Sequence, residues 1–61
     1  MTNDEREHMR ELAHMLERMR ELCSVMKTEV DATRFSALSS EFSCLLVRAE
    51  AHLRLLEKSD D

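Results

Sequence analysis

Apolar residues recur through the first half of the chain at alternating steps of three and four residues. The run begins at Met9, and its members are Met9, Leu12, Leu16, Met19, Cys23, Met26 and Val30. This spacing places the side chains on one face of an α-helix and is typical of a helix that packs along another helix. We therefore predict a first helix over about residues 3–29.

A second run with the same spacing begins at Phe35 and is out of phase with the first. Its members are Phe35, Leu38, Phe42, Leu45, Ala49, His52 and Leu56. Between the runs lie β-branched and acidic residues, which are modest helix formers. Asp31 or Thr33 can cap a new helix by accepting hydrogen bonds from the following backbone amides. The break predicts a turn at about residues 30–32 and a second helix at about 33–58.

Together the two runs predict an all-α fold, an antiparallel two-helix hairpin with a coiled-coil-like seam that spans residues 1–61 as one domain. The residues expected to form the core of the seam are Leu12, Leu16, Met19, Met26, Phe35, Leu38, Phe42 and Leu45. The chain contains no glycine or proline to force a break. A single continuous helix with a stutter, in a long parallel coiled coil, is therefore the alternative.

Several apolar residues fall outside the expected seam. Met15 and Leu22 are assigned to one flank of the hairpin, whereas Leu46 and Leu53 are assigned to the other flank, beside Ala13. A weaker patch of smaller residues around Val47 is expected on the far side of the second helix. Because two helices bury little apolar surface, extra apolar residues on such a core indicate a protein interface. We predict that the partner-binding residues are Met15, Leu22, Leu46, Leu53, Ala13 and Val47.

Composition narrows the possible partners. The net charge is −4, and charged residues make up 36% of the chain. The absence of glycine excludes a glycine-rich phosphate loop. Arg6, Arg20 and Lys27 share one heptad position but are interleaved with acidic residues, so we expect a solvated edge and no nucleic-acid or membrane partner. No apolar run approaches the roughly 20 residues of a membrane span.

The histidines and cysteines offer little catalytic or metal-binding chemistry. His8, Glu11 and His14 are spread around the helix by their three-residue steps, so we expect solvated side chains and no metal site. His52 occupies a seam position and is expected to reach water near the open end of the hairpin. Cys23 is expected to be a small core residue, and Cys44 has no general base nearby. We therefore expect free thiols, no cofactor and no enzymatic activity.

The segment that opens the second helix supports a family resemblance. Its sequence is Asp31-Ala32-Thr33-Arg34-Phe35, and Leu38, Glu41 and Leu45 follow at helical spacing. With the chain length and the two amphipathic helices, this segment resembles the small helical-hairpin co-chaperones of type III secretion needle subunits, the YscE, PscE and AscE type. The resemblance covers the whole chain in organisation and residues 31–45 in detail.

The resemblance implies a cytoplasmic bacterial co-chaperone that is not an enzyme. Such a protein binds and stabilises a larger tetratricopeptide-like chaperone, and together they keep the needle subunit monomeric before export. The alternative is an RNA-binding regulator of the Rop kind, which is also a helical hairpin of this length and dimerises into a four-helix bundle. A salt-dependent RNA gel shift separates the two functions.

Overall fold

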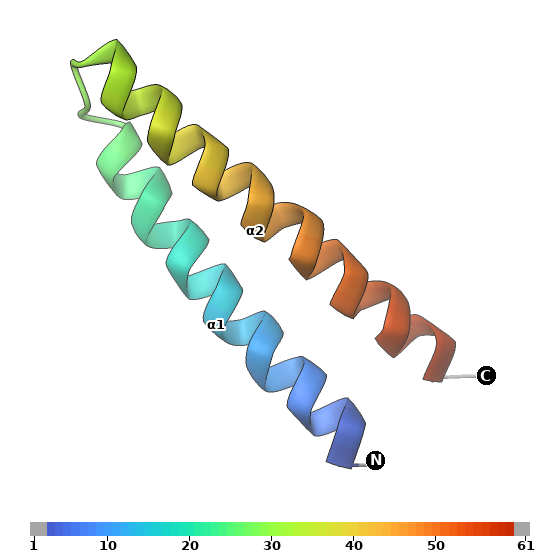
Figure 1. Ribbon diagram of the computed structural model, residues 1–61. Coiled ribbons are helices and arrows are strands. Elements are labelled where there is room, and N and C mark those ends of the chain that lie inside the picture. Colours follow the sequence, from blue (N-terminus) through green and yellow to red (C-terminus); the bar gives the residue numbers. More distant parts are fainter. Residues whose placement is uncertain (1–2, 60–61) are drawn as a thin grey trace.

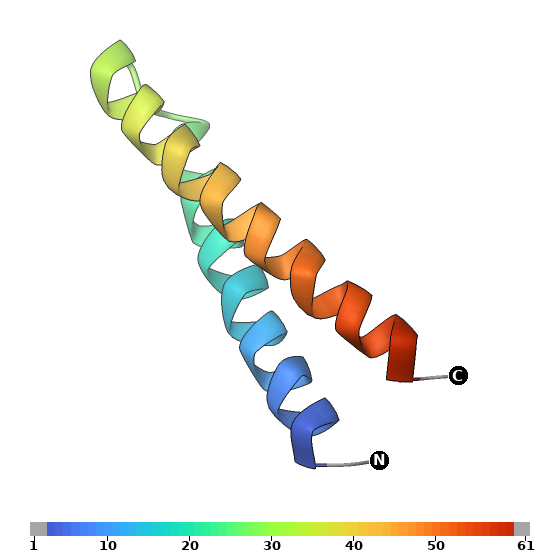
Figure 2. The same ribbon diagram turned by 45° about the vertical axis from the view of Figure 1, so that its right-hand side comes forward.

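The structure, a computed structural model, describes residues 3–59 as two α-helices, α1 (Asn3–Met26) and α2 (Ala32–Ser59). The helices run antiparallel, side by side, and are joined by a short connection at one end, with the start of α1 and the end of α2 at the other (Figures 1 and 2). The hairpin measures 45 × 14 × 12 Å, and the described residues contain no strand. The predicted all-α hairpin is therefore confirmed, and the continuous helix is excluded.

The first helix ends at Met26, three residues earlier than the sequence pattern predicts. The amide of Lys27 still donates to the carbonyl oxygen of Cys23, at 3.1 Å. The amide of Thr28 instead donates to the carbonyl oxygen of Val25 at 3.2 Å, and the Thr28 hydroxyl donates to the same oxygen at 3.4 Å. These bonds to the third preceding residue tighten the last turn and end the helix.

The second helix begins where the sequence predicts a cap. The Asp31 carboxylate accepts hydrogen bonds from the amides of Thr33 at 2.8 Å and Arg34 at 3.4 Å. The Asp31 carbonyl oxygen accepts the first bond of the helical ladder, from the amide of Phe35 at 2.9 Å. Because amides at a helix start have no partner within the helix, this side chain fixes the start of α2.

The predicted seam of α2 is largely confirmed. Ala49 is 3% exposed, and the other seam residues of α2 are partly buried, namely Leu38, Phe42, Leu45, His52 and Leu56. Phe35 differs, because its side chain is 43% exposed. Since α1 ends at Met26, little of α1 lies opposite this first turn of α2. Val30, predicted as the last seam residue of the first run, lies in the connection and is 97% exposed.

The predicted seam of α1 is wrong on one of its two sides. Met15, Met19 and Leu22 are 6%, 8% and 2% exposed, and they form most of the buried core. Leu16, predicted to lie in the seam, is 53% exposed, and Cys23 is also exposed. The observed seam of α1 consists of His8, Leu12, Met15, Met19, Leu22 and Met26. Met15 and Leu22 therefore belong to the core, and their predicted place on an exposed flank is wrong, so they offer no surface to a partner of the folded hairpin.

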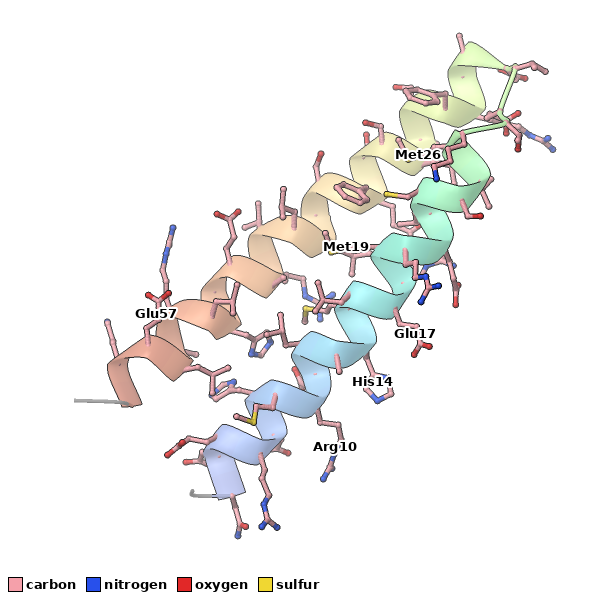
Figure 3. The ribbon with its side chains drawn as sticks, turned by 180° about the vertical axis from the view of Figure 1, so that it is seen from behind. Arg10, His14, Glu17, Met19, Met26 and Glu57 are labelled. Atoms are coloured by element: carbon pink, nitrogen blue, oxygen red, sulfur yellow. The ribbon has the colours of Figure 1, made fainter. Side chains whose placement is uncertain are left out.

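The difference arises because α1 carries three neighbouring apolar rows. The middle row contains Leu12, Met19 and Met26 and belongs to both the predicted and the observed seam. The rows on either side of it are displaced by about 40–60° around the helix. α2 packs over the row that contains Met15 and Leu22, and it leaves the row of Met9, Leu16 and Cys23 outside the seam. Figure 3 shows Met19 and Met26 between the helices, whereas Arg10, His14 and Glu17 point away from α2.

Candidate functional site

Large apolar side chains are concentrated on one side of the hairpin. Of the nine that are exposed among the described residues, five lie on this side, and we call these five the apolar flank. They are Met9 (44% exposed), Leu16 (53%), Phe35 (43%), Leu46 (43%) and Leu53 (46%). The other four are spread over the connection and the remaining surfaces of the two helices. A gathering of this kind on a small protein indicates a binding surface.

Helical spacing and the packing of the two helices bring these residues together. Met9 and Leu16 are seven residues apart on α1, and so are Leu46 and Leu53 on α2, so each pair follows one row along its helix. Both rows lie on the side away from the Arg18–Glu41 contact, which joins the two helices across the opposite flank. The two rows therefore border the same side of the seam, which gives one surface with contributions from both helices.

A groove of about 350 Å³ lies at the turn end of the apolar flank. Both helices line it, with Cys23, Met26 and Lys27 from α1 and with Phe35 and Phe42 from α2. Lys27 is the one charged lining residue. The groove confirms that the row of Cys23 on α1 faces the same side as Phe35 on α2. Its walls can accept an apolar side chain, and the Lys27 ammonium can pair with an acidic group beside it.

The opposite flank is held by a polar contact. The Arg18 Nε donates to Glu41 Oε2 at 2.8 Å, and Arg18 Nη1 lies 3.3 Å from Glu21 Oε2. The hydrogen bond to Glu41, followed by the one to Glu21, raises the pKa of the Arg18 guanidinium above its ordinary value. Because these side chains are about half exposed, the pair adds little to the stability of the hairpin, but it shows that these two residues lie level on the two helices.

The histidines are arranged differently from the prediction. His8 Nδ1 and His52 Nδ1 lie 2.8 Å apart, and the ring centroids are separated by 4.9 Å. His52 Nε2 also lies 3.3 Å from Glu11 Oε2, and the His52 side chain is 17% exposed. The prediction of a solvated His8 is therefore wrong, because the rotation of the α1 seam brings His8 against α2. His52 is likewise bonded mainly to protein groups.

This histidine pair does not form a metal site. Glu11 and His8 contact opposite nitrogens of the His52 ring, so the three side chains do not converge on one point. Within residues 3–59, no group of three or more histidine, cysteine, aspartate or glutamate side chains is placed to hold a metal ion. The two cysteines, Cys23 and Cys44, are free and exposed.

The predicted partner-binding residues have separate outcomes. Leu46 and Leu53 are exposed on the apolar flank, and Ala13 is exposed near its edge. Val47 is 66% exposed, but it lies on the face of α2 turned away from α1. Met9 and Leu16 were missed because the sequence pattern placed them in the seam. The sequence does carry a signal for them, because α1 has two possible outer apolar rows. If α2 packs on the row of Met15 and Leu22, the row of Met9 and Leu16 is left exposed.

Neither helix contains, within the described residues, an apolar stretch long enough to cross a membrane. No protein-family model, curated protein sequence or solved structure matches the chain.

Proposed function

We propose that this protein is a non-enzymatic co-chaperone that binds and stabilises a larger tetratricopeptide-like chaperone through its apolar flank. In this proposal, the two proteins keep a type III secretion needle subunit monomeric in the bacterial cytoplasm before export. The observation that carries the proposal is the unequal division of apolar residues. The described residues bury four side chains, Met15, Met19, Leu22 and Ala49, and expose five large ones on one flank.

A partner explains why so thin a core is sufficient. Two helices bury too little apolar surface to be more than marginally stable alone. A protein that binds only the folded hairpin raises its apparent stability by RT ln(1 + [L]/Kd), which is about 2.7 kcal/mol at a concentration of 100 Kd. Binding at the apolar flank would supply this stabilisation, because it removes Leu16, Leu46 and Leu53 from water at the same time.

A helical partner fits the shape of the surface. The flank consists of straight rows of side chains along two antiparallel helices, and such rows pack into the grooves between the residues of another helix. The groove at the turn end offers a place for one larger apolar side chain of the partner. The identity of the partner as a tetratricopeptide-like chaperone rests on the resemblance of residues 31–45 to needle-subunit co-chaperones.

The experiment compares substitutions at two similarly exposed positions of α1, one on the apolar flank and one outside it. Leu16 is 53% exposed on the apolar flank, and Val25 is 50% exposed outside it. Each variant is co-expressed with the tetratricopeptide-like chaperone of the same secretion system, and the complex is purified and titrated by calorimetry. We expect Leu16→Glu to weaken binding by about 2 kcal/mol or more, because it places an unpaired charge in an apolar contact, and Val25→Glu to bind as the wild type does.

Two results would contradict the proposal. The first is that the wild-type chain binds no tetratricopeptide-like chaperone. The second is that Leu16→Glu and Val25→Glu bind it equally well. An RNA gel shift that weakens steeply with salt would instead support the RNA-binding alternative.

A further inference from the structure

We propose that, in the absence of another partner, two copies of this chain cover each other's apolar flanks and form a two-fold dimer with both turns at the same end. The dimer is a four-helix bundle in which each helix lies antiparallel to its neighbours. This inference stands apart from the proposed function, since it requires only the surface of the hairpin itself. It commits to a second copy because the charges along the two edges of the flank complement each other.

The flank runs along most of the hairpin. Arg18 lies opposite Glu41, and His8 lies opposite His52, which fixes the alignment of the two helices. In this alignment, Leu16 and Leu46 lie near the middle of the hairpin. Met9 and Leu53 lie towards the open end, and Phe35 lies at the turn. Apolar side chains are therefore available at three levels along a molecule 45 Å long.

The two edges of the flank carry opposite charge. Along the outer edge on α1, the basic residues Arg6, Arg20 and Lys27 share one heptad row with Ala13. Along the outer edge on α2, the corresponding row contains Ser36, Ser43, Glu50 and Glu57. Glu50 and Glu57 lie on either side of Leu53, and with Arg54 these three residues line a shallow surface groove. Arg54 is four residues from Glu50 and lies farther around α2 from the seam than Glu50 or Glu57. The row that borders the flank is thus basic along α1 and acidic along α2 near the open end.

Charge decides between the two ways in which a two-fold axis can bring the flanks together. An axis parallel to the helices places α1 of one copy on α2 of the other, so that Arg6 lies level with Glu50 and Glu57 of the second copy. An axis perpendicular to the helices places α1 on α1, and the basic rows then face each other. Opposite charges across an interface favour one register, and like charges disfavour the other. The turns therefore lie at the same end.

The size of the apolar flank limits the area that a dimer can bury. A standard interface buries about 800 Å² on each partner. One side of a molecule of 45 × 14 × 12 Å is comparable with this area but not larger. We therefore expect a dimer that depends on protein concentration and exchanges with monomer. The same flank would bind the proposed chaperone, so the dimer and that complex would exclude each other.

Sedimentation of the full chain over a range of concentrations tests the dimer. We expect the wild type to change from monomer to dimer with rising concentration. Leu46→Glu should weaken the dimer about tenfold or more, since it charges the centre of the interface. Val47→Glu, at the next position but on the outer face of α2, should dimerise as the wild type does. A monomer at every concentration, or equal dimerisation of the two variants, would overturn the inference.

Two further measurements test the arrangement and do not depend on Leu46→Glu folding correctly. Arg6→Glu and Glu57→Lys should each weaken the dimer severalfold, and the combined variant should recover most of the loss. A spin label at Val30→Cys, with Cys23→Ala and Cys44→Ser, should give an intermolecular distance of about 10–30 Å, since bundle helices pack 8–10 Å apart. A distance near the 45 Å length of the hairpin would place the turns at opposite ends and overturn the arrangement.

Discussion

Leu22 is the most deeply buried large side chain of the described residues, at 2% exposure, whereas Leu16 is 53% exposed. The two residues have the same chemistry and lie on the two outer rows of α1, on either side of the middle row. We expect Leu22→Ala to lower the free energy of unfolding by about 2–5 kcal/mol, because it leaves a cavity in the seam. Leu16→Ala should change it by about 0.5 kcal/mol or less, as for exposed sites in general.

Urea denaturation followed by circular dichroism measures both changes. The protein concentration should be low enough that the urea midpoint no longer depends on it, so that self-association does not contribute. A larger loss for Leu16→Ala than for Leu22→Ala would show that α1 packs on the row of Leu16, as the sequence pattern alone suggests.

The contact between His8 and His52 is a polar link inside an apolar seam. One ring nitrogen donates to the other at 2.8 Å, so removal of one ring leaves the other with an unsatisfied, partly buried nitrogen. We expect His52→Leu alone to lower stability by about 1 kcal/mol, and the double variant His8→Leu/His52→Leu to equal or exceed the wild type, since both partners become apolar.

A double-mutant cycle on thermal unfolding measures the interaction between the two rings. Additive effects of the two single substitutions would show that the rings do not interact. In that case the contact between the two rings does not contribute to holding the open end of the hairpin.

At the scale of the elements, the start of α2 depends on one side chain. The Asp31 carboxylate accepts bonds from the amides of Thr33 and Arg34, and no glycine or proline helps to separate the helices. We expect Asp31→Ala to cost about 0.5–2 kcal/mol, because the first amides of α2 lose their acceptor. Asp31→Asn is the matched control and should cost little, since asparagine caps nearly as well. Equal losses for the two variants in chemical denaturation would show that the cap does not set the start of α2.

The elements also show what the sequence could and could not predict. The cap at Asp31 and the seam of α2 were predictable, because α2 carries one clear pair of apolar rows from Leu38 to Leu56. The seam of α1 was not, because Met15 and Leu22 lie on one side of the middle row while Met9 and Leu16 lie on the other. Both outer rows combine with the middle row at steps of three and four residues, so periodicity does not distinguish between them. Only the packing of α2 against α1 selects between them.

For the molecule as a whole, the same ambiguity limited the prediction of the candidate site. Leu46 and Leu53 were predictable as exposed because the seam of α2 was predicted correctly. Met9 and Leu16 were not, because they had been assigned to the seam of α1. When α2 packs on a different row of α1 from the one predicted, residues predicted for the core lie on the surface, and residues predicted for the surface lie in the core. The proposed tetratricopeptide-like partner comes from the resemblance of residues 31–45 and not from these rows.

In the proposed function, one set of residues folds the hairpin and a separate set binds the partner. Leu45 is partly buried in the seam, and the adjacent Leu46 is 43% exposed on the apolar flank. A glutamate at position 45 forces a charge between the helices, whereas a glutamate at position 46 places it on the proposed binding surface.

The most direct test compares Leu45→Glu and Leu46→Glu by circular dichroism and by co-purification with the tetratricopeptide-like chaperone. We expect Leu45→Glu to lose most of its helix, and Leu46→Glu to keep its helix but lose the chaperone. If both variants retain the chaperone, or if both lose their helix, the division between seam and flank is wrong.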